Sequence, residues 1–149
     1  MSEDDDFDIP SFLPYLLTQA AEASSLEFQR IYKARYGILR TEWRVLFHLG
    51  HFGEMTAREI CDRTKTHKTK VSRAVQKLSD RRYVVRTRDE QDRRSERLSL
   101  TPQGMAVYRD LKTIAATYDR ALLDRFSSAD AENCAMRCAF CLACGLGRD

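Results

Sequence analysis

The sequence predicts a mainly α-helical fold with one small β-hairpin. Three observations lead to this fold class. Apolar residues recur every three or four positions along most of the 149-residue chain, which is the period of an amphipathic helix. Only two short runs, Tyr83–Arg88 and Ser95–Leu100, are typical of β-strands, and a polar segment separates them. Helix start signals precede several of the periodic stretches.

The length and composition indicate one domain with extended ends. Hydrophobic residues make up 43% of the chain and charged residues 32%, which is enough apolar material for a core. The N-terminus, Met1–Asp8, is acidic where a signal peptide needs cationic residues. The longest nearly apolar run starts at Cys138 and is too short to span a bilayer. We therefore expect a cytoplasmic protein.

The N-terminal half begins with two predicted helices. Residues 1–10 are expected to be disordered. Residues from about Ser11 to Tyr36 predict a long helix, which Gly37 is well placed to end. A second helix is predicted over Arg40–His51, with Gly53 as its stop.

Two shorter helices follow. Thr56 and Glu59 have the spacing of a capping box and predict a helix start at that point. A break near Thr66 leads to a helix over about Lys68–Asp80, whose apolar residues follow the i, i+3, i+4, i+7 pattern. Its opposite face carries Thr69, Ser72, Arg73 and Gln76, with Lys70 and Lys77 on either side.

The hairpin and two more helices complete the chain. Thr101 predicts an N-cap and Pro102 a first helical position, where proline loses no hydrogen bond. The apolar spacing extends this helix to Phe126. Ser127 can cap a last helix over about Ser128–Leu146.

The positive charge is concentrated in one segment. Residues Arg63–Arg97 contain 13 Lys and Arg against 5 Asp and Glu, a net charge of +8, whereas the rest of the chain carries −5. A basic segment of this kind indicates a surface for a polyanion, although a solvated charged face is the simpler explanation. Two short helices joined by a tight turn and followed by a charged ribbon describe a winged helix-turn-helix.

The run from Met55 to Gly104 resembles the DNA-binding core of the MarR family of bacterial transcription regulators. The part most specific to that family is DRRSERLSLTPQG, residues 92–104, which is similar to its wing signature of Asp-x-Arg, a strand ending in Leu-Thr, and a Gly. The resemblance covers nearly the whole chain. It implies a winged helix-turn-helix lobe over residues 38–101, with terminal helices over 11–37 and 102–149 that form the seam of an obligate homodimer.

The resemblance and the charge pattern together predict a double-stranded DNA-binding transcription regulator. We expect a dimeric repressor on a pseudo-palindromic operator, with no enzymatic activity, no cofactor and no membrane. A helix fits the major groove, where polar side chains reach base edges and cations reach phosphates. The predicted DNA-contacting residues are His67, Lys68, Thr69, Lys70, Ser72, Arg73, Gln76, Lys77, Arg93 and Arg94. Asp92 is predicted to hold one wing arginine in place.

Three positions depart from the family pattern. Arg82 lies where the family usually has a Gly that ends the recognition helix, so either Arg82 is left-handed or the helix ends differently. His67 replaces a small capping residue, and Thr66 is an alternative cap. Leu39 replaces the usual capping Thr before the second helix.

The C-terminal cysteines allow more than one interpretation. Cys134, Cys138, Cys141 and Cys144 are spaced so that helical packing in a dimer seam explains them, since cysteine behaves as a small hydrophobe. Redox sensing or metal binding is the alternative, although a rigid helix cannot bring all four thiols to one zinc ion. An iron–sulfur enzyme is a more remote reading. Cys61 is expected in the core.

By resemblance, a small aromatic or phenolic effector is expected to bind between the dimerisation helices and the winged-helix lobe and to release the DNA. The candidate lining residues are Tyr15, Trp43, Arg44, His48 and Tyr108, although a place in the core or on the surface is the simpler explanation for each. His48 and His51 lie three positions apart, but no third ligand is close to them in the sequence. A winged helix that serves only protein–protein contact is another alternative.

Overall fold

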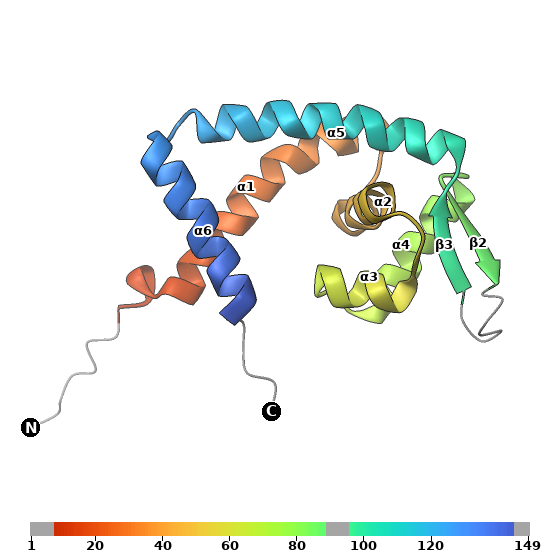
Figure 1. Ribbon diagram of the computed structural model, residues 1–149, viewed down its shortest axis with the longest axis horizontal. Helices are drawn as coiled ribbons and strands as arrows, with labels where there is room; N and C mark the ends of the chain where they lie inside the picture. Colours follow the sequence, from red (N-terminus) through yellow and green to blue (C-terminus); the bar gives the residue numbers. More distant parts are fainter. Residues whose placement is uncertain (1–7, 89–95, 145–149) are drawn as a thin grey trace, which may run out of the picture. The chain divides into compact units, whose positions relative to one another are not determined.

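The structure is a computed structural model that describes residues 8–88 and 96–144. It consists of two compact units, which meet between Leu111 and Lys112. The described elements, in chain order, are η1 (Ile9–Ser11), α1 (Leu13–Tyr36), α2 (Arg40–Phe52), β1 (Met55–Thr56), α3 (Ala57–Thr64), α4 (Lys68–Asp80), β2 (Val84–Arg88), β3 (Glu96–Leu100), α5 (Pro102–Leu123) and α6 (Ser128–Cys144) (Figure 1). The mainly α-helical fold with a small hairpin is confirmed.

The corner between α1 and α2 forms as predicted around Gly37. Gly37 is left-handed, with φ 62°, and its N–H donates to the Lys33 carbonyl at 2.8 Å. Glycine has no Cβ, so it adopts this conformation at little cost. The start of α1 was predicted slightly too early, because residues 9–11 form a separate 3-10 turn and the α-helix begins at Leu13.

The helix-turn-helix consists of α3 and α4. The predicted capping box begins α3: the Thr56 hydroxyl accepts from the Glu59 N–H at 3.2 Å, and the Glu59 carboxylate accepts from the Thr56 N–H at 2.7 Å. Lys65, left-handed with φ 52°, ends α3. His67 then caps α4, since its Nδ1 accepts from the Thr69 N–H at 3.3 Å. The alternative cap was wrong, because the Thr66 hydroxyl donates to the Thr64 carbonyl instead.

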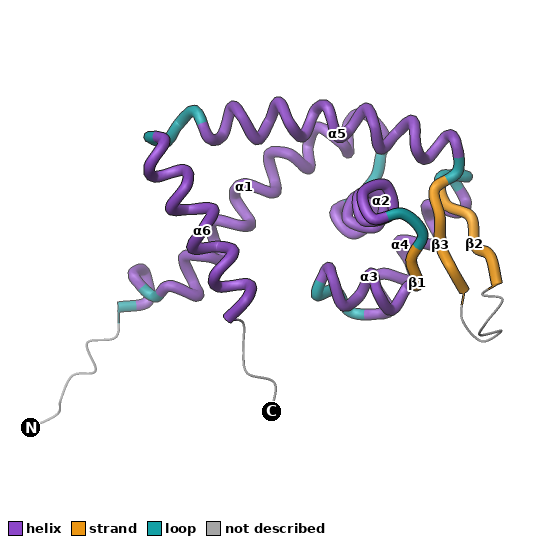
Figure 2. The backbone as a smooth tube through the Cα atoms, viewed as in Figure 1, coloured by secondary structure: helices purple, strands orange, loops and turns teal. Residues whose placement is uncertain are grey.

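The sheet has three antiparallel strands in the order β1–β3–β2, and β1 was not predicted. Met55 pairs with Leu98 on one side of β3, and Arg86 pairs with Leu98 on the other. In the described part of the chain, strand occurs only in this small sheet (Figure 2). A two-residue strand has no periodic signal, so only pairing in the folded chain reveals β1.

The core of the first unit lies where α2, α4 and the sheet pack together with the ends of α1, α3 and α5. Its apolar side chains are almost fully excluded from solvent, which is the main source of stability in a small domain. They are Phe28, Tyr32, Ile38, Val45, Leu46, Leu49, Met55, Ile60, Val71, Ala74, Val75, Leu78, Val84, Leu98, Val107, Tyr108 and Leu111.

Two glycines allow the backbone around α5 to pack closely. A Cβ on Gly104 would lie 2.1 Å from the Tyr83 carbonyl oxygen, and one on Gly50 would lie 2.4 Å from the ring of Tyr108. Thr101 fixes the start of α5: its hydroxyl donates to the Arg82 carbonyl at 2.6 Å and accepts from the Gly104 N–H at 3.0 Å. The start of α5 therefore has almost no free space against the segment that follows α4.

The second unit contains the rest of α5 and α6. The end of α5 was predicted too late, because the helix ends at Leu123 and not at Phe126. Ser127 caps α6 as predicted, accepting from the Asp130 N–H at 3.1 Å. No described residue of α6 is buried, and the side chains of Met136, Phe140 and Leu142 are 63%, 66% and 80% exposed. None of the described helices is both long enough and apolar enough to cross a membrane.

Candidate nucleic-acid interface

The recognition helix α4 separates its residues into two faces as the sequence predicts. Val71, Ala74, Val75 and Leu78 are buried against the core. The opposite face is polar and exposed, and its residues are His67, Lys68, Thr69, Lys70, Ser72, Arg73, Gln76 and Lys77. The predicted DNA-contacting side chains of this helix therefore all lie on the solvent side.

After His67, whose ring caps the helix, five side chains in the N-terminal half of this face have no partner in the described part of the chain. Within residues 8–88 and 96–144, no hydrogen bond or ion pair engages the side chains of Lys68, Thr69, Lys70, Ser72 or Arg73. Three of these side chains are cations and two are hydroxyls that can donate or accept. Unpaired groups of this kind are free to bind phosphates and base edges.

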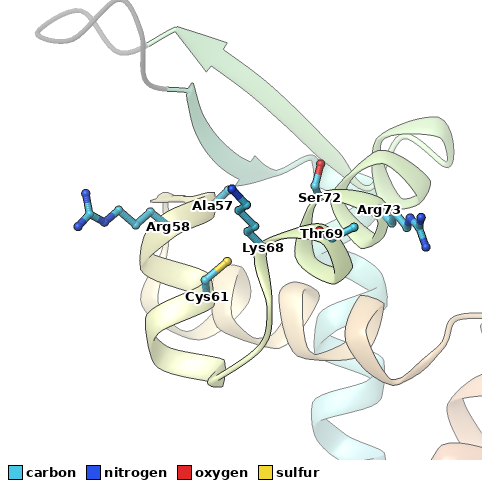
Figure 3. Close-up of a pocket in the computed structure, with 7 residues that line it drawn as sticks. All are labelled: Ala57, Arg58, Cys61, Lys68, Thr69, Ser72 and Arg73. Carbon is cyan, nitrogen blue, oxygen red and sulfur yellow. The ribbon is translucent and has the colours of Figure 1, made fainter. Parts of the chain in front are cut away.

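A groove of about 730 Å³ runs between α3 and this half of α4. Ala57, Arg58 and Cys61 line it from α3, and Lys68, Thr69, Ser72 and Arg73 line it from α4. In Figure 3 the Cys61 thiol and the Lys68 side chain project into the groove, while Arg58 and Arg73 extend outward on opposite sides. Cations thus surround an apolar floor beside the exposed face of α4.

The prediction that Cys61 lies in the core is wrong. It is half-buried, and its thiol lies on the floor of the groove. Desolvation, followed by the nearby charge of Asp62, raises the pKa of this thiol above its ordinary value. At neutral pH Cys61 is therefore a protonated and weakly nucleophilic side chain.

The C-terminal half of the polar face is bound within the fold. The Gln76 amide donates to the Asp80 carboxylate at 2.8 Å and accepts from the Arg86 guanidinium at 3.0 Å. Arg86 also lies 3.4 Å from the Glu96 carboxylate across the hairpin. These contacts connect the end of α4 to β2 and β3, so Gln76 holds the base of the hairpin against the helix.

Lys77 is paired with a buried carboxylate. Its ammonium lies 3.4 Å from one oxygen of Glu42, which is 4% exposed. The other Glu42 oxygen accepts from the Leu39 N–H at 3.0 Å. The Glu42 carboxylate thus supplies one half of a capping box, whereas the apolar Leu39 side chain cannot supply the other half. Lys77 balances the charge of Glu42.

Arg81 connects the recognition helix to α1 and was not predicted. Its guanidinium donates to the Tyr36 carbonyl and, at 3.0 Å, to the Gly37 carbonyl. Its partners are backbone groups 44 and 45 residues away, so no sequence signal separates Arg81 from the other arginines of the basic segment. The next residue, Arg82, is left-handed with φ 60°, which confirms the first of its two predicted alternatives.

The same corner is attached to α5. The Asp110 carboxylate accepts from the Tyr36 hydroxyl at 2.6 Å and from the Arg35 guanidinium at 2.7 and 3.1 Å. These hydrogen bonds, first from Tyr36 and then from Arg35, hold the pKa of Asp110 below its ordinary value. Desolvation and then the Asp110 hydrogen bond raise the pKa of Tyr36. The ends of α1 and α4 and a turn of α5 are thereby joined.

The tip of the wing lies outside the described residues, and with it the predicted roles of Asp92, Arg93 and Arg94. At the base of the wing, Arg97 donates to the Glu54 carboxylate at 2.9 Å. Arg88 at the end of β2 is exposed. The described part of the hairpin therefore directs a cationic strand end away from the core.

The candidate effector residues are only partly brought together. Trp43 stacks on Tyr32 with centroids 5.7 Å apart and also contacts Phe47, which in turn packs on Tyr108. The Trp43 indole N–H is buried and has no hydrogen-bond acceptor among the described residues. Trp43 and Tyr108 therefore belong to one aromatic cluster.

The other three candidates lie elsewhere. His48 Nδ1 is 2.7 Å from the Arg44 carbonyl, which ties its ring to its own helix. Arg44 is half-buried. Tyr15 is 43% exposed near the start of α1 and precedes Phe28 by 13 positions, or about 20 Å along a helix. Tyr15 thus does not join the aromatic cluster within its own chain.

The cysteines of α6 form an exposed row. Cys134, Cys138 and Cys141 are exposed free thiols on one helix, and Cys144 is its last residue. Among the described residues, no group of three or more His, Cys, Asp or Glu side chains is arranged to hold a metal ion. His48 and His51, although they share α2, form no such group.

Comparisons with known proteins agree with this arrangement. Residues 36–95 match the model of the MarR family. YwoH, an uncharacterized HTH-type transcriptional regulator of Bacillus subtilis, is 27% identical over 97 residues, which cover 65% of this chain and 70% of YwoH.

Solved structures share the fold over most of their length. A MarR transcriptional regulator from Methanosarcina mazei has a TM-score of 0.74 and 29% identity, over 87% of this chain and 96% of the other. The Staphylococcus aureus regulator MepR, solved as a DNA complex, has a TM-score of 0.77 and 18% identity, over 89% of this chain and 97% of MepR. Residues 36–95 of this chain therefore match the MarR family, and the chain has the fold of solved MarR-family transcription regulators.

Proposed function

We propose that this protein is a homodimeric repressor that binds a pseudo-palindromic operator and leaves it when a small aromatic effector binds. The observation that carries the proposal is the unpaired N-terminal half of the α4 face. Its three cations and two hydroxyls have no partner in the described part of the chain, so nothing has to be broken before they meet DNA. Lys68, Lys70 and Arg73 are assigned to phosphates and base edges, and Thr69 and Ser72 to base edges.

The C-terminal half of the same face is assigned a supporting role. Lys77 and Arg81 are engaged by Glu42 and by the α1 carbonyls, and Gln76 is engaged by Asp80 and Arg86. If Gln76 or Lys77 contacted DNA directly, the hydrogen bonds of Gln76 or the ion pair between Lys77 and Glu42 would first have to break. We therefore place the main reading surface at His67–Arg73 and assign the later residues to its orientation, with Arg93 and Arg94 reaching the minor groove or its phosphates.

A second copy is the proposed partner of α6. This helix buries no described residue, and its large apolar side chains Met136, Phe140 and Leu142 are mostly exposed. Apolar area of this extent on one helix is typical of an interface between chains. MepR was solved bound to DNA, and a twofold dimer of such lobes presents two recognition helices to half-sites about one turn of DNA apart.

Duplex binding measured against salt concentration tests this proposal. The probe is the DNA upstream of the protein's own gene, labelled and titrated at several salt concentrations. We expect the logarithm of the affinity to fall linearly with the logarithm of salt, because phosphate contacts release counterions. Footprinting should protect an inverted repeat. Failure to bind any inverted repeat from this region in dilute buffer, or a monomer at micromolar concentration, contradicts the proposal.

The effector site is assigned to the aromatic cluster around Trp43. An effector with an acceptor oxygen would satisfy the unpartnered indole N–H, and its ring would pack against the neighbouring aromatic side chains. Trp43 is the chain's single tryptophan, so its fluorescence reports this cluster alone. Titration with hydroxybenzoates should change that fluorescence and weaken duplex binding over the same concentration range. A fluorescence change without any loss of DNA affinity separates binding from regulation and contradicts the release step.

A further inference from the structure

The thiols of α6 form a compact row that the DNA-binding function does not use. Cys134 and Cys138 are four positions apart, and Cys138 and Cys141 are three apart, all within α6. Residues at these spacings have Cβ atoms only about 5–6 Å apart on a helix surface. Cys134 and Cys141, seven positions apart, are separated by two turns, or about 10 Å along the axis. Among Cys134, Cys138 and Cys141, Cys138 is therefore the one with a neighbour on each side.

The three thiols are accessible and interact with one another. All three are exposed and free. The pKa of the Cys138 thiol is raised, first by partial desolvation and then by the proximity of Cys134 and Cys141. The row is thus a set of exposed thiols that lie close together on one helix.

This chemistry disfavours two familiar uses of cysteine. Peroxide sensing depends on a thiolate stabilised by nearby positive charge, whereas Cys138 has a raised pKa and its close neighbours are other thiols. A structural zinc site needs four ligands, and the described residues bring no three ligands together. A ligand that needs only two adjacent sulfurs remains compatible with the geometry.

We propose that Cys138, with Cys134 or Cys141 as its partner, is a dithiol site that captures trivalent arsenicals. Trivalent arsenic is soft and forms strong bonds to two sulfurs at once, and neighbouring turns of a helix hold two thiols within reach of one arsenic atom. With phenylarsine oxide, two As–S bonds form, the As–O bond breaks, and the oxygen leaves as water with both thiol protons. No oxidant or reductant takes part.

The test uses the full-length reduced protein and phenylarsine oxide. The parent protein for all variants carries Cys144→Ser. This substitution leaves Cys134, Cys138 and Cys141 as the cysteines of α6. Intact-mass spectrometry is expected to show one phenylarsenic group per chain with the loss of one water. A bridged adduct resists excess monothiol such as 2-mercaptoethanol and is removed by the dithiol 2,3-dimercaptopropanol, so both treatments follow loading.

The thiol variants locate the site. Cys138→Ser in the parent background leaves thiols two turns apart and should lose the monothiol-resistant adduct. Cys134→Ser and Cys141→Ser each leave one close pair and should keep it, as should the control Cys61→Ser. The proposal is overturned if the parent takes up no resistant adduct, or if Cys138→Ser retains it. These readouts do not involve DNA, so they succeed or fail independently of the proposed repressor function.

Discussion

The two halves of the recognition helix both present polar side chains to solvent but have opposite relations to the rest of the molecule. Lys68, Lys70 and Arg73 in the first half have no internal partner among the described residues, whereas Gln76 and Lys77 in the second half are held by the hairpin and by Glu42. One half is therefore available for a ligand and the other fixes where that half lies. Cationic residues on a helix cannot be assigned to DNA from their charge alone.

The strongest test of the anchored half concerns Gly104, where the chain after α4 meets α5. Gly104→Ala places a methyl group 2.1 Å from the Tyr83 carbonyl oxygen, so the backbone must shift. Overpacking of this kind costs about 1–3 kcal/mol, and we expect the upper part of that range because the obstacle is backbone. Thermal unfolding followed by circular dichroism measures the loss. The neighbouring exposed Gln103→Ala variant is the control and should unfold close to the wild-type temperature. An unchanged melting temperature for Gly104→Ala would show that the close approach is not needed.

Replacing Arg73 tests the free half. Arg73→Ala should weaken duplex binding by about tenfold, or about 1.4 kcal/mol, because a good contact to a base or phosphate is lost. If the contact is to a phosphate, the log–log salt slope also falls by about one unit. Melting temperature should not change, since no described residue pairs with Arg73. Arg30→Ala is the charge-matched control, because Arg30 is an exposed arginine on α1. Equal affinity for Arg73→Ala and wild type would remove this residue from the reading surface.

Replacing Arg81 tests the opposite expectation for a cation only eight positions further along. Arg81→Ala removes the hydrogen bonds to the Tyr36 and Gly37 carbonyls and should lower stability by about 1 kcal/mol. Duplex affinity should fall severalfold because the recognition helix is less well oriented. The salt slope should stay at the wild-type value. A slope reduced by about one unit would instead make Arg81 a phosphate contact.

The smallest expected effect concerns pH at the same corner. Because the pKa of Asp110 is lower in the folded protein, its ionised form stabilises the fold above the ordinary carboxyl pKa of about 3.9. That stabilisation is lost as pH falls through the lowered value. The urea midpoint of Asp110→Asn should therefore lie below that of wild type at pH 7, and the difference should narrow as the pH falls below about 3.9. A difference that persists unchanged at pH 3 would mean that the carboxylate charge is not what joins α1 to α5.

Much of the fold could be predicted because its signals are local. The capping box at Thr56, the left-handed Gly37 and the proline at the start of α5 depend on residues within one turn of each other. The two-residue strand β1 could not be predicted, because its only evidence is pairing with β3 more than 40 positions away. The shorter α5 also departs from its apolar pattern, which continues beyond the last helical residue.

The sequence by itself determined the polar face of α4, the order of helices and hairpin, and the row of thiols, since each follows from helical period and spacing. Only the tertiary structure decided which polar side chains of that face form hydrogen bonds or ion pairs within the fold. Glu42, the Gly37 carbonyl and Arg86 come from other elements, and their approach to Lys77, Arg81 and Gln76 is set by how the helices pack. Hydrogen bonds and ion pairs act over a few ångströms in space, whatever the separation in sequence, and spacing along one helix cannot report them.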